Sequence, residues 1–131
     1  MNLQFSTACA AATLIAALGV TGLAAGDSTS LMKKELQGVD GMEVNIVDYD
    51  VGSDWASDRH IHPGHLFVYV TEGTIEIAVE GEDPRTIAAG EVYYKQPNQP
   101  MVGRSVSTEG AKFTVFQVGP IGEPIMVSQP E

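Results

Sequence analysis

Residues 68–79 read VYVTEGTIEIAV, and this stretch decides the fold class. Residues 68–71, before Glu72-Gly73, are all β-branched or aromatic, and after it Ile75, Ile77 and Val79 alternate with Glu76 and Ala78. This alternation is typical of strands that bury one face, and Glu72-Gly73 is a suitable turn between them. The stretch therefore predicts two antiparallel strands joined as a β-hairpin.

The same pattern continues through most of the chain. From Met42 onward, short runs of β-branched and aromatic residues are separated by Gly, Pro, Asp and Asn at intervals of about ten residues. No segment has helical periodicity, so the pattern favours an all-β sandwich or barrel. The expected strands are residues 43–51, 59–62, 66–71, 74–79, 85–87, 92–95, 101–105 and 112–118.

Composition limits the partners and the kinds of site. The 131 residues include 7 Lys plus Arg against 17 Asp plus Glu, and the net charge of −10 repels nucleic-acid phosphates, so we expect no nucleic-acid partner. The 44% hydrophobic content is enough for one core. Cys9 is the only cysteine, which excludes an internal disulfide and any multi-cysteine metal site.

The amino-terminal segment predicts export. Residues 8–25 (ACAAATLIAALGVTGLAA) carry no charge and precede Gly26-Asp27, with small residues where a signal peptidase cleaves, although no Lys or Arg precedes the run. We expect residues 1–26 to be a signal peptide, which implies a periplasmic or secreted protein. The alternative is a membrane anchor, in which an uncleaved segment is the only membrane contact. We expect residues 27–41 to be a polar arm or a first edge segment, residues 42–126 to be the barrel and residues 127–131 to be a tail.

Two motifs in the barrel region resemble those of the small single-domain cupins. The first cupin motif places two histidines one residue apart, a glutamate four residues later and then a glycine. His60, His62 and Gly73 match it, whereas Leu66 stands at the glutamate position. The resemblance covers residues 42–126.

The second motif matches in its glycine and its turn. Gly90 and the proline-rich residues 96–100 fit, but Met101 stands at the histidine position and Ser105 at the asparagine position. The resemblance implies a cupin-type antiparallel double-stranded β-barrel, similar to a jelly roll, with a pocket lined by one sheet. It also implies that a homodimer is an expected assembly. Cupins include enzymes and binding proteins, so the fold alone does not give the reaction.

His60 and His62 are the leading metal-ligand candidates. Residues two apart in a strand share a face, with Cα atoms roughly 6.6 Å apart, so both imidazoles can reach one ion. With the cupin motif in place, Met101 offers a thioether as a third ligand or else fills the pocket wall. His65 is a further candidate ligand or a rim residue, depending on whether the chain bulges before it. Asp58 shares the parity of the histidine pair and offers a carboxylate, or is a solvated charge.

The ligand types favour copper. Leu66 replaces an anionic oxygen, and the Met101 sulfur suits Cu(I) better than Fe(II) or Mn(II). Zinc, nickel, iron and manganese are the alternatives. The leading hypothesis is an exported cupin that senses, buffers or presents a metal, or a small-molecule ligand bound through it. The sequence leaves enzymatic activity open, with a metal-dependent oxygenase-like or isomerase-like enzyme acting on a small oxygenated compound as the rival. A metal-free barrel for a small apolar molecule is a third hypothesis.

Overall fold

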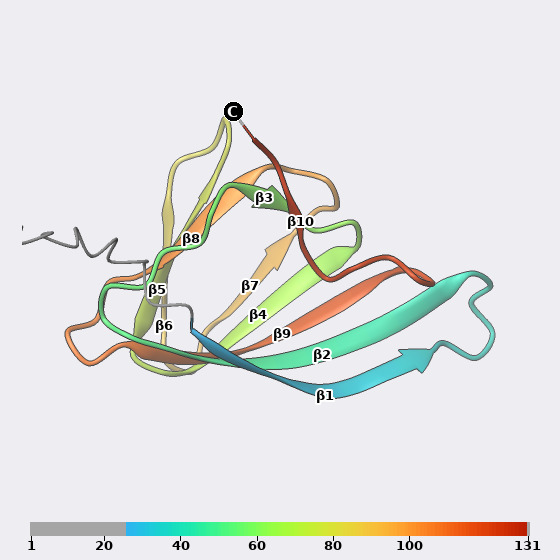
Figure 1. Ribbon diagram of the computed structural model, residues 1–131, viewed down its shortest axis with the longest axis horizontal. Coiled ribbons are helices and arrows are strands. Elements are labelled where there is room, and N and C mark those ends of the chain that lie inside the picture. The colour runs from blue at the N-terminus through green and yellow to red at the C-terminus, as the bar shows by residue number, and fades with distance from the viewer. Residues whose placement is uncertain (1–25, 131) are drawn as a thin grey trace, which may run out of the picture.

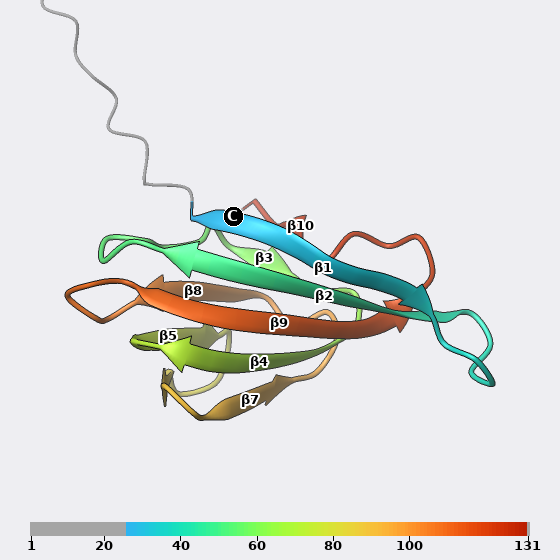
Figure 2. The same cartoon turned by 90° about the horizontal axis from the view of Figure 1, so that it is seen from below.

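The computed structural model describes residues 26–130, which form two five-stranded antiparallel sheets that face each other (Figure 1). The first sheet has the strand order β1-β2-β9-β4-β7, which Figure 2 shows side by side, and the second has the order β10-β3-β8-β5-β6. This arrangement confirms the predicted all-β barrel. The strands are β1 (Asp27–Glu35), β2 (Met42–Val51), β3 (His60–Ile61), β4 (His65–Glu72), β5 (Thr74–Val79), β6 (Arg85–Ala88), β7 (Val92–Lys95), β8 (Met101–Ser105), β9 (Ala111–Pro120) and β10 (Val127–Ser128).

The core lies between the two sheets and follows the period-two pattern of the sequence. Along β4 the exposed and buried residues alternate, and β5 shows the same alternation from the opposite sheet. Each fully buried aliphatic side chain contributes about 1.5–3 kcal/mol to stability. The inward side chains of these two strands are Leu66, Val68, Val70, Ile75, Ile77 and Val79.

The predicted pairing of residues 68–79 as a hairpin is wrong. β4 pairs with β7 and β9, whereas β5 pairs with β6 and β8, so the turn at Gly73 carries the chain from one sheet to the other. Gly73 has φ +70°, and a Cβ at this position would collide with the carbonyl oxygen of Gly110. Alternation shows that each strand buries one face, but both strands bury that face in the same core from opposite sides.

Two strands lie outside those predicted. The arm contains β1, which pairs with β2 along its length and forms an edge of the first sheet, as the edge-segment alternative requires. Every residue of β1 is exposed, so the sequence has no buried face to reveal it. In the expected tail, β10 pairs Val127 with Ile61 and Ser128 with His60. A two-residue strand forms only through this tertiary pairing.

The expected signal segment lies, apart from Gly26, outside the described residues. In the part of the chain that the structure describes, we find no helix with the length and hydropathy of a membrane span.

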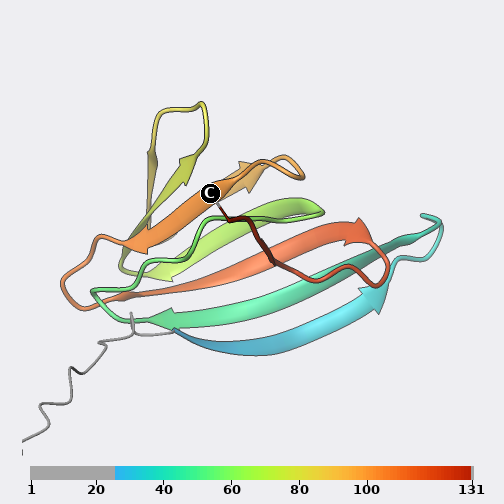
Figure 3. The same cartoon turned by 45° about the horizontal axis from the view of Figure 1, so that its top comes forward.

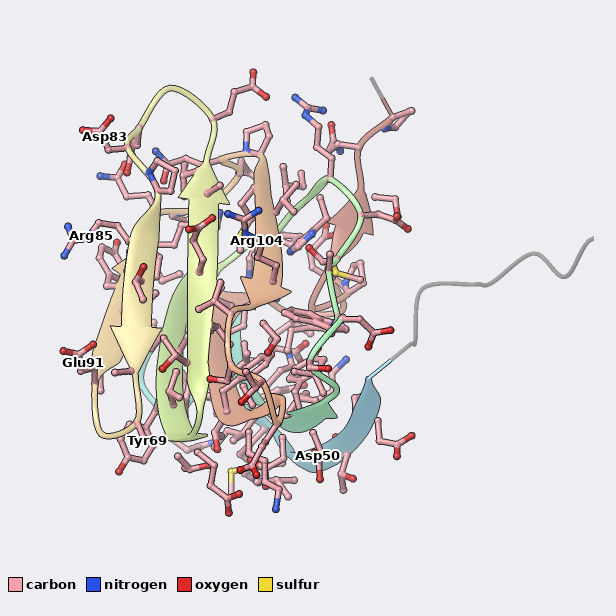
Figure 4. All side chains as sticks on the ribbon, turned by 90° about the vertical axis from the view of Figure 1, so that its left-hand side faces the viewer. Asp50, Tyr69, Asp83, Arg85, Glu91 and Arg104 are labelled. Atoms are coloured by element: carbon pink, nitrogen blue, oxygen red, sulfur yellow. The ribbon has the colours of Figure 1, made fainter. Side chains whose placement is uncertain are left out.

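Charged side chains lie on the outer face of the second sheet (Figure 4). Arg104 on β8 lies 2.6 Å from Glu76 on β5, measured between Nη2 and Oε1. Such an exposed pair contributes only about 0–1 kcal/mol. Its position matters more, because the outward charges of these two strands leave Ile75, Ile77 and Met101 to face the interior.

Candidate metal centre

His60 and His62 lie buried at the inner face of the second sheet, with exposed fractions of 4% and 5%. His60 belongs to β3, and His62 follows it in the connection to β4. The His60 ring donates from Nδ1 to the backbone carbonyl of Asp58 at 2.7 Å, and His62 Nδ1 donates to the carbonyl of Ile125. A carbonyl only accepts, so both neutral rings carry their proton on Nδ1.

These two hydrogen bonds leave both Nε2 atoms as free acceptors that face each other. The Nε2 atoms are 3.1 Å apart, and the rings meet edge to face at 81°. Two nitrogen ligands, each about 2.0–2.1 Å from one ion, lie roughly 2.9–3.4 Å apart in octahedral or tetrahedral geometry. The histidine pair therefore fits a shared transition-metal ion, and the backbone carbonyls supply the outer hydrogen bonds that usually orient such ligands.

The electrostatic surroundings keep both imidazoles neutral at pH 7. Burial lowers the pKa of His60 below its ordinary value of 6.5. Burial also lowers the pKa of His62 to about 4, and the nearby charge of His60 acts in the same direction. A metal binds the unprotonated ring, so this environment favours the ligating form.

The carboxyl-terminal segment completes the surroundings of His62. After β9 the chain turns back and runs beside β3, where β10 pairs with it (Figure 3). This return places the carbonyl of Ile125 against His62 and the carbonyl of Pro124 against Gln117. Residues far apart in the sequence thus fix the orientation of one imidazole.

A pocket of about 60 Å³ adjoins the histidine pair. Its walls are mostly apolar and include Trp55, which packs against Phe113 with ring centres 5.6 Å apart. Gly103 permits this arrangement, because a Cβ there would lie 3.2 Å from the indole. A cavity needs about 10–15 Å³ of such space to hold one water molecule, so the pocket accommodates an ion with a few small ligands.

Met101 and Leu66 both lie beside the histidines, where the motif alignment places them. Met101 is the pairing partner of His60 across β3 and β8, and its side chain lines the pocket with an exposed fraction of 6%. Leu66, which is 1% exposed, lines the pocket from the opposite sheet. The two replaced ligand positions of the cupin motif therefore lie together at the pocket.

The structure does not bring His65 into this pocket. His65 lies on the outer face of β4, exposed to solvent, where its Nδ1 is 2.8 Å from the Tyr94 hydroxyl and its ring stacks on the tyrosine ring. The outward parity continues in Phe67, so the chain does not bulge to reverse it. His65 is accordingly removed from the candidate ligands.

Asp58 also contributes no carboxylate to the pocket. Its side chain is exposed, and only its backbone carbonyl meets the site, as the acceptor for His60. Within residues 26–130, no cluster of three or more His, Cys, Asp or Glu side chains is placed to hold an ion.

Two buried polar side chains near the site were not predicted. Lys95 is 2% exposed and donates through Nζ to the carbonyls of Gln96 and Gln99, and burial lowers its pKa to about 8. Gln117 is 1% exposed. Strand parity is the signal that could have found both. In β7, Val92 and Tyr94 face outward, so Lys95 faces inward, and Gln117 likewise has inward parity in β9. Lys and Gln usually lie on the surface, and this preference argued against burial.

Comparison with solved structures shows likeness at the level of the fold. A DMSP lyase, DddQ from Ruegeria pomeroyi DSS-3, matches with a TM-score of 0.63 and 19% identity over 86% of this chain and 56% of that one. The chain thus spans about half the length of that lyase. A cupin-like protein from Thermotoga maritima matches with a TM-score of 0.58 and 19% identity, over 79% of this chain and 75% of that one.

Sequence comparison identifies the family. No curated protein matches the chain. The family model of the cupin domain matches residues 45–117, which contain both motifs and more than half of the chain. The chain belongs to the cupin domain family.

Proposed function

We propose that this chain is an exported cupin that binds a transition-metal ion through His60 and His62 and senses, buffers or presents it, or a small ligand bound through it. One observation carries the proposal: two buried Nε2 atoms face each other at 3.1 Å while both Nδ1 protons are donated to backbone carbonyls. Two lone pairs at this distance repel unless a cation lies between them. A bound ion removes the repulsion and uses both acceptors.

Copper is the ion that the donor types favour. Met101 offers a soft neutral sulfur beside His60, and Leu66 replaces the anionic oxygen that would hold Fe(II) or Mn(II). Cu(II) binds almost any nitrogen site tightly, so preference for Cu(I) is the informative property. Zinc is the principal competitor, because it accepts imidazole nitrogens in tetrahedral sites.

A metal-dependent enzyme is the second candidate. The pocket beside the histidines is lined in part by Tyr49, and burial raises the pKa of the Tyr49 hydroxyl, so this phenol stays protonated at neutral pH. A DMSP lyase shares the fold, although at 19% identity. A bound ion would act as a Lewis acid on an oxygen of a small oxygenated substrate.

Export is supported by the uncharged residues 8–25, which precede the first charged residue, Asp27. Intact-mass measurement of the exported protein tests this part. A mature chain that begins near residue 26 supports export, and a soluble mature chain that retains Met1 contradicts it.

Metal titration of the purified protein tests the binding function. Trp55 is the only tryptophan of the chain and lines the pocket, so its fluorescence reports an ion at the histidines. We expect Cu(II) to quench this fluorescence at one equivalent, and His60→Ala to abolish the stoichiometric phase. A matched His65→Ala variant, on the outer face, should behave as wild type. Elemental analysis of protein from its own compartment then identifies the ion.

A further inference from the structure

Gln117 is a buried amide with one end unsatisfied. Its side chain is 1% exposed, and its Nε2 donates to the carbonyl of Pro124 at 3.2 Å. Among the residues that the structure describes, Oε1 finds no hydrogen-bond donor. Because the Pro124 carbonyl only accepts, the nitrogen end of the amide must face it, and the oxygen end points elsewhere.

Gln117 lies directly across from Leu66, which stands where the cupin motif has a glutamate ligand. Gln117 on β9 is the pairing partner of Leu66 on β4, and both side chains point inward. Directly paired residues have Cβ atoms about 4.5–5.5 Å apart, and Gln has the same chain length as Glu. An oxygen on residue 117 can therefore approach the region that a glutamate at residue 66 would reach.

Gln117 also lies beside the candidate ligands. Its amide is near enough to the His62 ring to raise the pKa of that histidine. The carbonyls that hold His62 and Gln117 come from consecutive residues, Ile125 and Pro124. Two consecutive residues of the carboxyl-terminal segment thus orient both side chains.

We propose that Gln117 Oε1 is a further protein ligand of the ion held by His60 and His62, and supplies from β9 the oxygen that Leu66 has removed from β4. This inference rests on the proposed metal-binding function. An amide oxygen is neutral and harder than a thioether, so it stabilises divalent ions more than Cu(I). The Gln117 oxygen would then favour binding of Zn(II), and the Met101 sulfur would favour binding of Cu(I).

The test compares Zn(II) and Cu(I) affinities of the full chain by competition with chromophoric chelators, and records Co(II) absorption spectra. We expect Gln117→Leu to lower the Zn(II) affinity about tenfold or more and to change the Co(II) spectrum, while the Cu(I) affinity stays within about threefold of wild type. A tenfold loss is the scale on which even the supporting groups of a metal site affect affinity. Gln117→Glu should strengthen Mn(II) and Zn(II), because it adds a charged oxygen. Ser105→Ala is the matched control, since Ser105 Oγ is also buried without a partner among the described residues.

The outcomes separate this inference from the proposed function. If wild type binds Zn(II), His60→Ala does not, and Gln117→Leu equals wild type in affinity and Co(II) spectrum, the role of Gln117 is overturned and the metal site stands. If wild type and His60→Ala bind equally weakly, the proposed function itself fails. A rise in thermal stability of Gln117→Leu with unchanged Zn(II) binding would identify Gln117 as an unsatisfied core amide only. Should Gln117→Leu not fold, unchanged Zn(II) and Mn(II) affinities in Gln117→Glu would overturn the inference.

Discussion

Acid should destabilise the metal-free protein through His62. Burial lowers the pKa of this histidine from its ordinary 6.5 to about 4 in the folded chain. Between these two values the unfolded chain binds more protons than the folded chain, so the free energy of unfolding falls as the pH falls. His60 acts in the same direction, because burial lowers its pKa too.

The size of the effect follows from the two pKa values of His62. At about 1.4 kcal/mol for each pH unit, the free energy of unfolding decreases by about 2 kcal/mol from pH 7 to pH 5, and by about 3 kcal/mol at pH 4. The loss is large for a domain whose whole stability is about 5–15 kcal/mol. Bound metal raises the stability at every pH but should not remove this loss, because the protons are taken up by the unfolded chain and a ligated imidazole stays unprotonated in the folded chain.

Urea unfolding followed by Trp55 fluorescence measures this effect, in chelator at several pH values from 7 to 5. The 17 acidic residues also respond to pH, so the informative quantity is the difference between wild type and His62→Gln, which lacks the titrating ring. We expect the pH dependence of His62→Gln to be shallower by about 2 kcal/mol over this range. Parallel curves for the two proteins would refute the assignment of a buried neutral imidazole.

Three further substitutions and one control variant probe the site and its scaffold. Met101→Leu should weaken Cu(I) binding and leave Zn(II) nearly unchanged, with a stability cost below about 1.5 kcal/mol; equal Cu(I) affinity would return Met101 to a wall residue. Gly64→Ala should destabilise the fold by about 2 kcal/mol or more, because its Cβ would lie 2.5 Å from the Val118 carbonyl oxygen and 2.8 Å from Gly119 Cα. Gly52→Ala is the control, because the nearest atom to its Cβ would be an oxygen of the movable Asp54 carboxylate at 3.2 Å, so this variant should lose less stability. Equal urea midpoints for Gly64→Ala and Gly52→Ala would contradict the clash at Gly64. Lys95→Met should tighten Zn(II) binding at pH 7, because the ammonium charge, which is near enough to lower the pKa of both histidines, also repels a cation bound to them, and the advantage should shrink as wild-type Lys95 deprotonates above about pH 8. Weaker Zn(II) binding at pH 7 would show that the lysine supports the site instead.

Strand alternation predicted β5, and Leu66, Val68 and Val70 of β4 lie inward as the cupin motif implies. The same rule placed His60 and His62 on one face, and it turned His65 outward when no bulge intervened. Pairing could not be predicted in the same way. A strand with one buried face fits either sheet of a two-sheet barrel, so the turn at Gly73 was mistaken for a hairpin.

The features that sequence reasoning missed depend on tertiary contacts. β1 is exposed along its whole length, and β10 forms only because the chain returns beside β3. The burial of Lys95 and Gln117 contradicts the usual outward position of these residue types. Lys95 is accommodated by two backbone carbonyls from the turn that follows it, and no local pattern predicts that geometry.

The protonation and ligation of the two histidine rings test the central claim most directly. Long-range ¹H–¹⁵N NMR of the metal-free protein at pH 7 identifies which ring nitrogen of His60 and His62 carries the proton. The structure predicts Nδ1–H in both rings, and one equivalent of Zn(II) should shift both Nε2 resonances together while those of His65 stay in place. An Nε2–H proton on both rings, or Nε2 resonances that do not respond to Zn(II), would contradict a shared ion between His60 and His62.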